Sequence, residues 1–234
     1  MFAVAFCMLI VNCGLLQSAE TPPNAKEKST ELATIGGKIT YRIDSKRPWR
    51  YRRYYIRSPK TGELSEAVVS LRAKRKQKSQ ASYKSKTYVI DQKNHSFYPE
   101  TTVLHVGDRV QFTNSDPGVH NVFADRLSYV FSFNLTEGQK FEKQFDKPVS
   151  AKRPIVLGCK YHSSMRAWIY VFDHPYYQLT AKDGHYRLEN VPPGEYRLEV
   201  AHPAGDLWHR QNILIRGGEK VTVNIRLSPE NRVD

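Results

Sequence analysis

The chain has 234 residues, enough for one large or two small domains with cores of their own. Aromatic residues make up 12 % of it, and Gly and Pro number 13 each, which argues against a disordered chain and favours a β-rich globular protein. The formal net charge is +13, and most of it comes from Lys46 to Lys86, where 14 Lys and Arg accompany 2 acidic residues. The rest of the chain is therefore close to neutral.

Residues 1–19 are apolar and nearly uncharged, and a polar, proline-containing linker follows at 20–34. This pattern predicts a cleaved signal peptide at 1–19, and hence a periplasmic or secreted protein with no remaining transmembrane span. A retained anchor is the alternative, although the apolar run is short for one. Cleavage would remove two of the three cysteines and two of the three methionines, leaving Cys159 and Met165.

Short alternating runs bounded by turn residues then continue to the end of the chain, and none has a convincing helical period. The expected strands are Gly37–Arg42, Ala67–Arg72, Thr87–Asp91, Thr101–Val106, Arg109–Thr113, His120–Phe123, Gln139–Phe145, Ile155–Cys159, Ala167–Phe172, His185–Leu188, Tyr196–Val200, Ile213–Ile215 and Val221–Leu227. Gly107-Asp108 predicts a tight hairpin between the fourth and fifth of them. Many short strands at regular spacing predict an all-β protein built from sandwiches or barrels.

The stretch Cys159-Lys-Tyr-His162-Ser-Ser-Met165 brings scarce sulfur residues close to a histidine, and His120 stands upstream at the start of a strand. A thiolate, two imidazoles and a weak axial thioether are the ligand set of a blue-copper site. Singly, a buried cysteine is more often a small core residue, a methionine a gap filler and a histidine a surface group. Zinc is the main competing ion, but a thioether is a poor zinc ligand. The combination therefore predicts copper.

Residues from about 87 to 172 resemble a cupredoxin of the plastocyanin and amicyanin kind. The similarity is carried by Phe97-Tyr-Pro99, Val106-Gly-Asp-Arg-Val-Gln-Phe-Thr-Asn114, His120-Asn121 and the loop that begins at Cys159. The resemblance implies one type 1 copper per chain, with the ligands His120, Cys159, His162 and Met165. It also implies that Asn121 pins the ligand loop by hydrogen bonds. The loop has the short amicyanin spacing but contains no proline.

A second resemblance lies near the C-terminus, where DGHYRLENVPPGEYRLEV at 183–200 is similar to the carboxypeptidase regulatory-like sandwich, a fold related to transthyretin and to carbohydrate-binding-like modules. The opening strands of that fold stand far upstream, at Gly36–Tyr41 and Glu66–Leu71. We therefore expect a Greek-key cupredoxin domain inserted into a small β-sandwich. The expected boundaries are 35–86 for the first part of the sandwich with its basic insert, 87–173 for the cupredoxin domain, 174–229 for the rest of the sandwich and 230–234 for a tail. Alternatively, the upstream strands are edge strands of the cupredoxin.

These patterns predict a monomeric electron-transfer protein rather than an enzyme, because no nucleophile with its base, open metal site or nucleotide loop is recognisable. Two other hypotheses stay open, a protein that holds or delivers copper and an envelope- or carbohydrate-binding module with a secondary copper site. The expected partner is an acidic redox protein or an anionic envelope surface, and not a nucleic acid. The candidate contact residues are Tyr161 and Pro117 beside His162, with Arg50, Arg52 and Arg53 for orientation.

Overall fold

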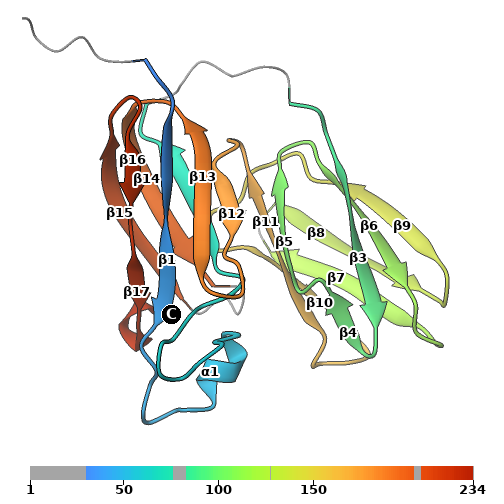
Figure 1. Cartoon of the computed structure of the whole chain (residues 1–234). Coiled ribbons are helices and arrows are strands. Elements are labelled where there is room, and N and C mark those ends of the chain that lie inside the picture. Colours follow the sequence, from blue (N-terminus) through green and yellow to red (C-terminus); the bar gives the residue numbers. More distant parts are fainter. Residues whose placement is uncertain (1–29, 76–82, 127, 203–206, 234) are drawn as a thin grey trace, which may run out of the picture.

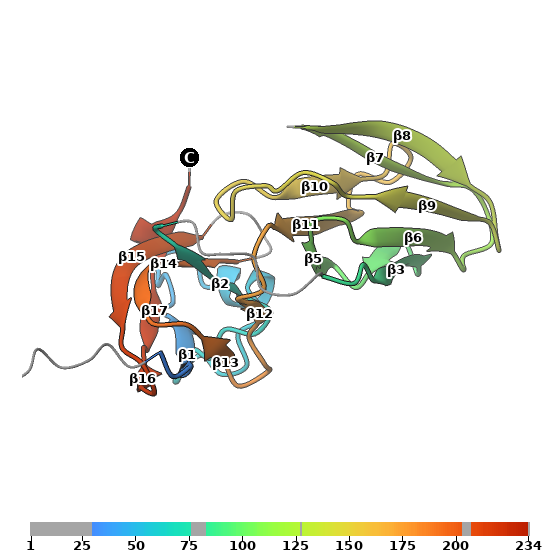
Figure 2. The same cartoon turned by 90° about the horizontal axis from the view of Figure 1, so that it is seen from above.

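The computed structural model describes residues 30–75, 83–126, 128–202 and 207–233. The expected signal peptide at 1–19, most of the expected linker and part of the basic run lie outside the described residues. The described chain is all-β apart from one short α-helix and one 3-10 turn, as the alternating sequence predicts. In Figures 1 and 2 it forms two β-sandwiches side by side.

One sandwich, which we call the inserted domain, consists of two mixed sheets that pack face to face. The strand order of the first is β5-β11-β10-β7-β8, and that of the second is β4-β3-β6-β9. The strands are β3 (Thr87–Lys93), β4 (Ser96–Tyr98), β5 (Thr101–His105), β6 (Arg109–Asn114), β7 (His120–Arg126), β8 (Tyr129–Leu135), β9 (Lys140–Gln144), β10 (Ile155–Gly158) and β11 (Arg166–Phe172). Alternate apolar residues such as Val110 and Phe112 point between the sheets and form the core.

The other sandwich, which we call the outer sandwich, is formed by strands from both ends of the described chain. One sheet has the order β13-β1-β16, with β17 also paired to β1, and the other has the order β12-β2-β14-β15. The strands are β1 (Ala33–Tyr41), β2 (Val68–Ala73), β12 (Tyr177–Leu179), β13 (His185–Val191), β14 (Gly194–Ala201), β15 (Trp208–Ile215), β16 (Lys220–Thr222) and β17 (Ile225–Leu227). A four-residue helix, α1 (Arg50–Arg53), and the 3-10 turn at Pro229–Asn231 complete this part.

Strand pairing shows that the first domain is inserted into the second. The strand β1 pairs with β13, so that Gly37 lies opposite Tyr186, and β2 pairs with β14, so that Leu71 lies opposite Leu198. The strands β3 to β11 pair only with one another. The upstream strands are therefore part of the outer sandwich, and the alternative that they are edge strands of the cupredoxin-like domain is wrong.

An apolar interface joins the two domains. The outward face of β11 contributes Tyr170 and Phe172, which pack with Val68 of β2 and Ala201 of β14. Ala151, from the loop before β10, is buried in the same cluster. Because large aromatic side chains of one domain are covered by the other, each sandwich contributes to the stability of the other.

The expected hairpin at Gly107-Asp108 is wrong, because β5 and β6 belong to different sheets. The physical reason lies in Asp108, which is fully buried. Its carboxylate accepts the backbone N–H groups of His105 at 2.8 Å and Lys86 at 2.8 Å. The turn thereby takes the chain from one sheet to the other instead of returning it along the same sheet.

Three strands, β4, β8 and β12, and the helix α1 were not expected from the sequence, and the expected strand Val221–Leu227 is divided into β16 and β17. At this division the N–H of Val223 donates to the carbonyl of Gly36 at 2.8 Å. A Cβ on Gly37 would lie 2.0 Å from the carbonyl oxygen of Val223, so glycine is required where the two backbones meet.

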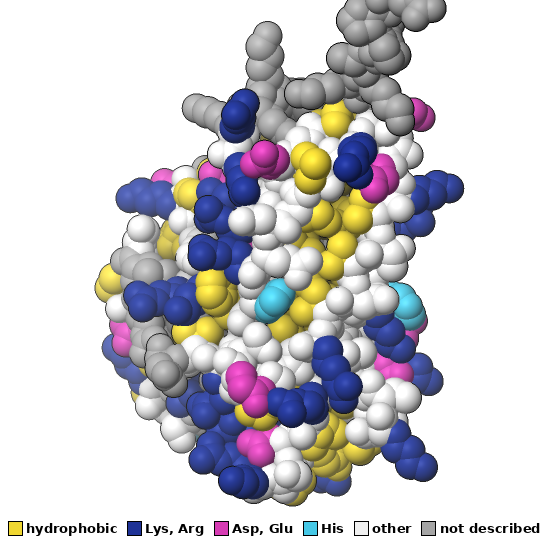
Figure 3. Space-filling view, turned by 90° about the vertical axis from the view of Figure 1, so that its left-hand side faces the viewer, with side chains coloured by type: hydrophobic (Ala, Val, Ile, Leu, Met, Phe, Trp, Pro, Cys, Tyr) yellow, Lys and Arg dark blue, Asp and Glu magenta, His cyan; other side chains and the backbone are white. Residues whose placement is uncertain are grey.

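The described residues of the basic run, 46–75 and 83–86, do not form one surface. Its first part surrounds α1, whereas Arg72 and Lys74 at the end of β2 form ion pairs with Asp173 at 2.9 Å and Glu195 at 3.3 Å. Figure 3 shows further Lys and Arg side chains scattered over the outer sandwich, with acidic side chains between them. This mixture of both signs agrees with the near-neutral charge of the chain outside the basic run.

Candidate metal centre

The topology of the inserted domain brings His120 and the loop from Cys159 to Met165 together at one end of its first sheet. His120 is the first residue of β7, Cys159 directly follows β10, and Met165 directly precedes β11. The three strands are neighbours, because β10 pairs with β7 through Gly158 and Phe123 and with β11 along its whole length. The short loop from β10 to β11 carries His162 back toward His120.

The side chains of His120, Cys159 and His162 converge there. Each offers one ligand atom, and these atoms all lie within 4.8 Å of one another. The two Nδ1 atoms of His120 and His162 are 3.1 Å apart, and the thiol sulfur of Cys159 lies 3.7 Å from Nδ1 of His162. Among the described residues no other group of His, Cys, Asp or Glu side chains converges in this way.

Of the four expected ligands, only His162 reaches the surface. His120 is 2 %, Cys159 5 % and Met165 1 % exposed, while His162 is partly exposed. Met165 belongs to the same apolar cluster as Cys159, and its N–H donates to the carbonyl of His162 at 3.0 Å. The ligand loop is therefore closed by its own backbone, although it contains no proline.

Asn121 contacts the ligand loop through its backbone, and its side chain reaches the loop indirectly. Its backbone N–H donates to the sulfur of Cys159 at 3.4 Å, but its side-chain amide donates to Ser132, Phe133 and Asn134 of β8. The amide of Asn134 in turn donates to the hydroxyl of Tyr161 at 2.9 Å. The side chain of Asn121 thus reaches the ligand loop only through Asn134.

Asp116 is a functional residue that the sequence analysis missed. Its buried carboxylate accepts a hydrogen bond from Nε2 of His120 at 3.0 Å and from the N–H groups of Asn94 and His95 at 2.7 and 2.9 Å. Burial by itself raises the pKa of Asp116, but these donors outweigh it and hold the pKa below its ordinary value. The contact keeps the proton of neutral His120 on Nε2, which leaves the Nδ1 lone pair for a metal.

His95, an exposed residue that the sequence did not connect with the metal ligands, also lies at the site. Its exposed ring stands perpendicular to that of His162, with centroids 4.7 Å apart, and nearly perpendicular to that of His120, at 5.4 Å. Asn94 and His95 both have a positive φ, a conformation that the carboxylate of Asp116 holds through their N–H groups.

The protonation states favour metal binding. Partial burial lowers the pKa of His162, and the neighbouring rings of His120 and His95 add to this effect, while Asp116 opposes it. His162 is therefore neutral at pH 7 and can donate an imidazole lone pair. A cysteine sulfur, two imidazoles and a thioether in the same loop are the donors that suit copper in both oxidation states, so the residues present fit a type 1 copper ion.

The candidate contact residues differ in their exposure. Tyr161 and Pro117 are exposed beside the cluster, and Arg52 and Arg53 are exposed on α1. Arg50 is only 5 % exposed, with its guanidinium carbon 5.3 Å from the ring centroid of Trp49. The expectation that Arg50 is part of a contact surface is wrong, because its place on the inner side of α1 was not visible from the sequence.

Comparison with protein families supports the second resemblance. Residues 167–228 match the model of the carboxypeptidase regulatory-like domain. The match begins inside β11, which pairs with β5 and β10 of the inserted domain, and then covers the C-terminal strands of the outer sandwich. No curated protein sequence matches the chain.

Solved structures similar to this chain are cupredoxins. A Cu-containing nitrite reductase from Thermus scotoductus SA-01 has 21 % identity over 44 % of this chain and 26 % of its own, with a TM-score of 0.33. A Cu(I) form of an amicyanin mutant has 18 % identity over 37 % of this chain and 82 % of its own, with a TM-score of 0.32. A purple cupredoxin from Nitrosopumilus maritimus has 19 % identity over 36 % of this chain and 99 % of its own, also with a TM-score of 0.32. This chain therefore spans about a quarter of the nitrite reductase.

Within the described residues, no helix has the length and apolar character needed to cross a bilayer.

Proposed function

We propose that this chain is an exported type 1 copper protein that transfers single electrons to or from a redox partner. The observation that carries the proposal is the convergence of His120, Cys159 and His162, with their ligand atoms within 4.8 Å of one another and Met165 buried beside them. In such a site copper would supply the one-electron redox couple. The protein supplies a ligand frame that needs little movement when the charge changes.

The supporting residues favour such a fixed frame. Asp116 holds the imidazole of His120 from behind, and the backbone N–H of Asn121 holds the sulfur of Cys159. Hydrogen bonds of this kind orient metal ligands and influence the charge on them. A frame that is already assembled before an electron arrives lowers the cost of reorganisation.

The partly exposed edge of His162 is the proposed point of electron exchange, with Tyr161 and Pro117 beside it. The helix α1 lies toward the same end of the molecule as β4 in Figure 1, and the hydroxyl of Tyr55 donates to Glu100, which follows β4. This position supports the proposal that Arg52 and Arg53 orient an acidic partner or an anionic envelope surface. Steering of this kind raises association rates by roughly 10- to 1,000-fold and is screened over about 8 Å at physiological salt.

Two measurements test redox function against a second proposal, in which the protein only holds or delivers copper. The electron self-exchange rate of the copper-loaded protein is fast for an electron carrier and slow for a copper-holding protein. The reduction potential should rise in Met165→Leu, because the thioether donor is lost while the volume of the side chain is kept. Slow self-exchange together with an unchanged potential in this variant would favour copper holding.

A further inference from the structure

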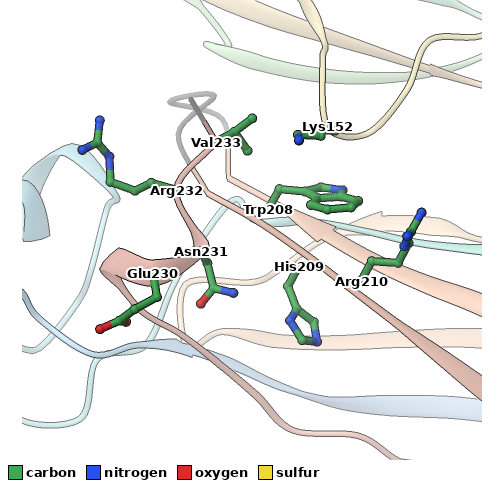
Figure 4. A pocket seen from close by; sticks show the side chains of 8 residues that line it. All are labelled: Lys152, Trp208, His209, Arg210, Glu230, Asn231, Arg232 and Val233. Carbon is green, nitrogen blue, oxygen red and sulfur yellow. The ribbon is translucent and has the colours of Figure 1, made fainter.

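A pocket of about 500 Å³ lies where the inserted domain meets the C-terminal end of the outer sandwich (Figure 4). This volume is within the range of small-molecule sites. One wall comes from the inserted domain and the others from β15 and the C-terminal segment. The lining residues are Lys152, Trp208, His209, Arg210, Glu230, Asn231, Arg232 and Val233.

The charge of the pocket wall is unbalanced. Lys152, Arg210 and Arg232 are cationic, and within the described part of the chain none of them forms an ion pair with an acidic side chain. The one acidic residue, Glu230, has both carboxylate oxygens on the guanidinium of Arg42, at 2.7 and 2.8 Å. The charge of Glu230 is thus offset by Arg42, and the three cations are left to attract an anion.

The cations are held in place before any ligand arrives. The Nζ of Lys152 lies 5.2 Å and the guanidinium carbon of Arg210 lies 5.3 Å from the ring centroid of Trp208, so one indole orients two cations. Glu199 lies opposite Arg210 across the β14–β15 ladder, yet no ion pair forms between them. The guanidinium of Arg210 therefore forms no ion pair with Glu199 and can bind a ligand.

The backbone that carries Lys152 and Arg232 is also fixed. Ala151 is buried in the domain interface, and the N–H of Lys152 donates to the hydroxyl of Ser150 at 3.2 Å. Arg232 is fixed by a backbone bridge to Leu207, directly before β15. The ammonium of Lys152 and the guanidinium of Arg210 are therefore already arranged beside Trp208, and an anion that binds them loses less side-chain entropy, whereas the side chain of Arg232 points away from Trp208 in Figure 4.

We propose that this pocket binds a small molecule with two or more anionic oxygen groups, a phosphoanhydride or a polycarboxylate. Arginine forks match the geometry of phosphate and carboxylate groups, and lysine adds a point charge. Because Lys152 belongs to the inserted domain and the two arginines belong to the outer sandwich, the ligand contacts both domains at once. The pocket shares no residue with the metal cluster, so this inference is independent of the proposed function.

Calorimetric titration of the full chain at low salt with inorganic pyrophosphate, and separately with citrate, tests the proposal. At least one of the two should bind saturably at one site per chain. Arg210→Gln should weaken that binding about tenfold, since it removes a charged hydrogen-bond donor, and Arg232→Gln should weaken it less, because the side chain of Arg232 points away from Trp208. Lys152→Met tests the same site from the other domain. The matched control is Arg216→Gln, which removes an exposed arginine just beyond β15 and should change the affinity less than about twofold.

Binding of pyrophosphate alone identifies a phosphate ligand, and binding of citrate alone identifies a carboxylate ligand. Either result, or binding of both, supports the proposal when the pocket variants weaken it. Absence of saturable binding with both probes overturns it. Equal weakening by Arg216→Gln and by the pocket variants also overturns it, because the attraction would then be that of the net charge alone.

Discussion

The two domains share one architecture and differ at their ends. Both are two-layered β-sandwiches with a continuous apolar core, and the core of the outer sandwich is as well buried as that of the inserted domain. At one end of the inserted domain, however, His120, Asn121 and Asp116 are buried beside Cys159 and Met165. In the described part of the outer sandwich no comparable group of metal-binding side chains converges. The comparison teaches that the sheets supply a rigid frame and that a few positions at strand ends supply the chemistry.

The largest expected effect is on the metal cluster alone. Cys159→Ser should abolish the colour of the copper-loaded protein, because the thiolate that gives charge transfer is lost. Its thermal unfolding without metal should change little, since the replacement is small and nearly isosteric. Ser164→Ala, an exposed change in the same loop, is the control and should keep the colour. Colour retained in the serine variant would break the assignment of Cys159 as a ligand.

The second effect should fall on the outer sandwich and spare the cluster. Gly37→Ala places a Cβ 2.0 Å from a backbone oxygen, and we expect a loss of about 3 kcal/mol or more of unfolding free energy. Chemical denaturation measures this loss, with Thr34→Ala on the same strand as control. Copper colour should persist at temperatures where the variant is folded. A stability equal to that of the control would show that β1 and the segment after β16 separate easily.

The domain junction should give stability a pH dependence of its own. Burial, helped by the charge of Arg72, lowers the pKa of His174 to about 4, whereas an unfolded histidine has a pKa of 6.5. Between these values the unfolded chain binds the proton more readily, so the contribution of His174 to the free energy of unfolding falls by about 3 kcal/mol as the pH is lowered from about 6.5 to about 4.

Denaturation of the metal-free protein across this pH range checks the effect. His174→Phe should reduce the slope. The slope should not vanish, because burial also lowers the pKa of His202, to about 3. An unchanged slope in His174→Phe would mean that the junction opens before His174 is protonated.

The smallest expected effect is a loss of copper affinity when the hydrogen bond between Asp116 and His120 is changed. Asp116→Asn keeps the shape of the side chain but removes the charge that faces Nε2 of His120, and copper affinity should fall about 10- to 100-fold. Competition with a chelator measures the affinity. Asp125→Asn, an exposed residue of β7, is the matched control. If Asp116→Asn and Asp125→Asn bind copper with equal affinity, Asp116 does not support His120 as a ligand. Its role would then be to hold the backbone of Asn94 and His95.

Much of the fold could be predicted from the sequence, because period-two alternation and turn residues directly reflect one buried face per strand. The split pattern of Gly36–Tyr41 and Glu66–Leu71 likewise indicated the insertion. The hairpin at Gly107-Asp108 failed because its turn residues are the same whether the chain returns or crosses to the other sheet. Only the buried carboxylate of Asp108, bonded to Lys86 and His105, distinguishes the two cases.

The candidate site could be predicted only where the spacing was local. Cys159, His162 and Met165 lie within one loop and could be predicted from their spacing. His120 lies far upstream and was predicted from the His120-Asn121 motif of the resemblance. Asp116 and His95 were missed because their part depends on the parallel pairing of β3 and β6, which brings the turn after β3 beside the turn after β6. The one available signal for Asp116 was its position four residues before His120.

The most direct test of the central claim is the visible spectrum of the purified protein as Cu(II) is added. We predict an intense blue colour from thiolate-to-copper charge transfer that saturates at one copper per chain. A protein that binds one equivalent of Cu(II) and stays colourless would contradict the assignment of His120, Cys159, His162 and Met165 as a type 1 copper site.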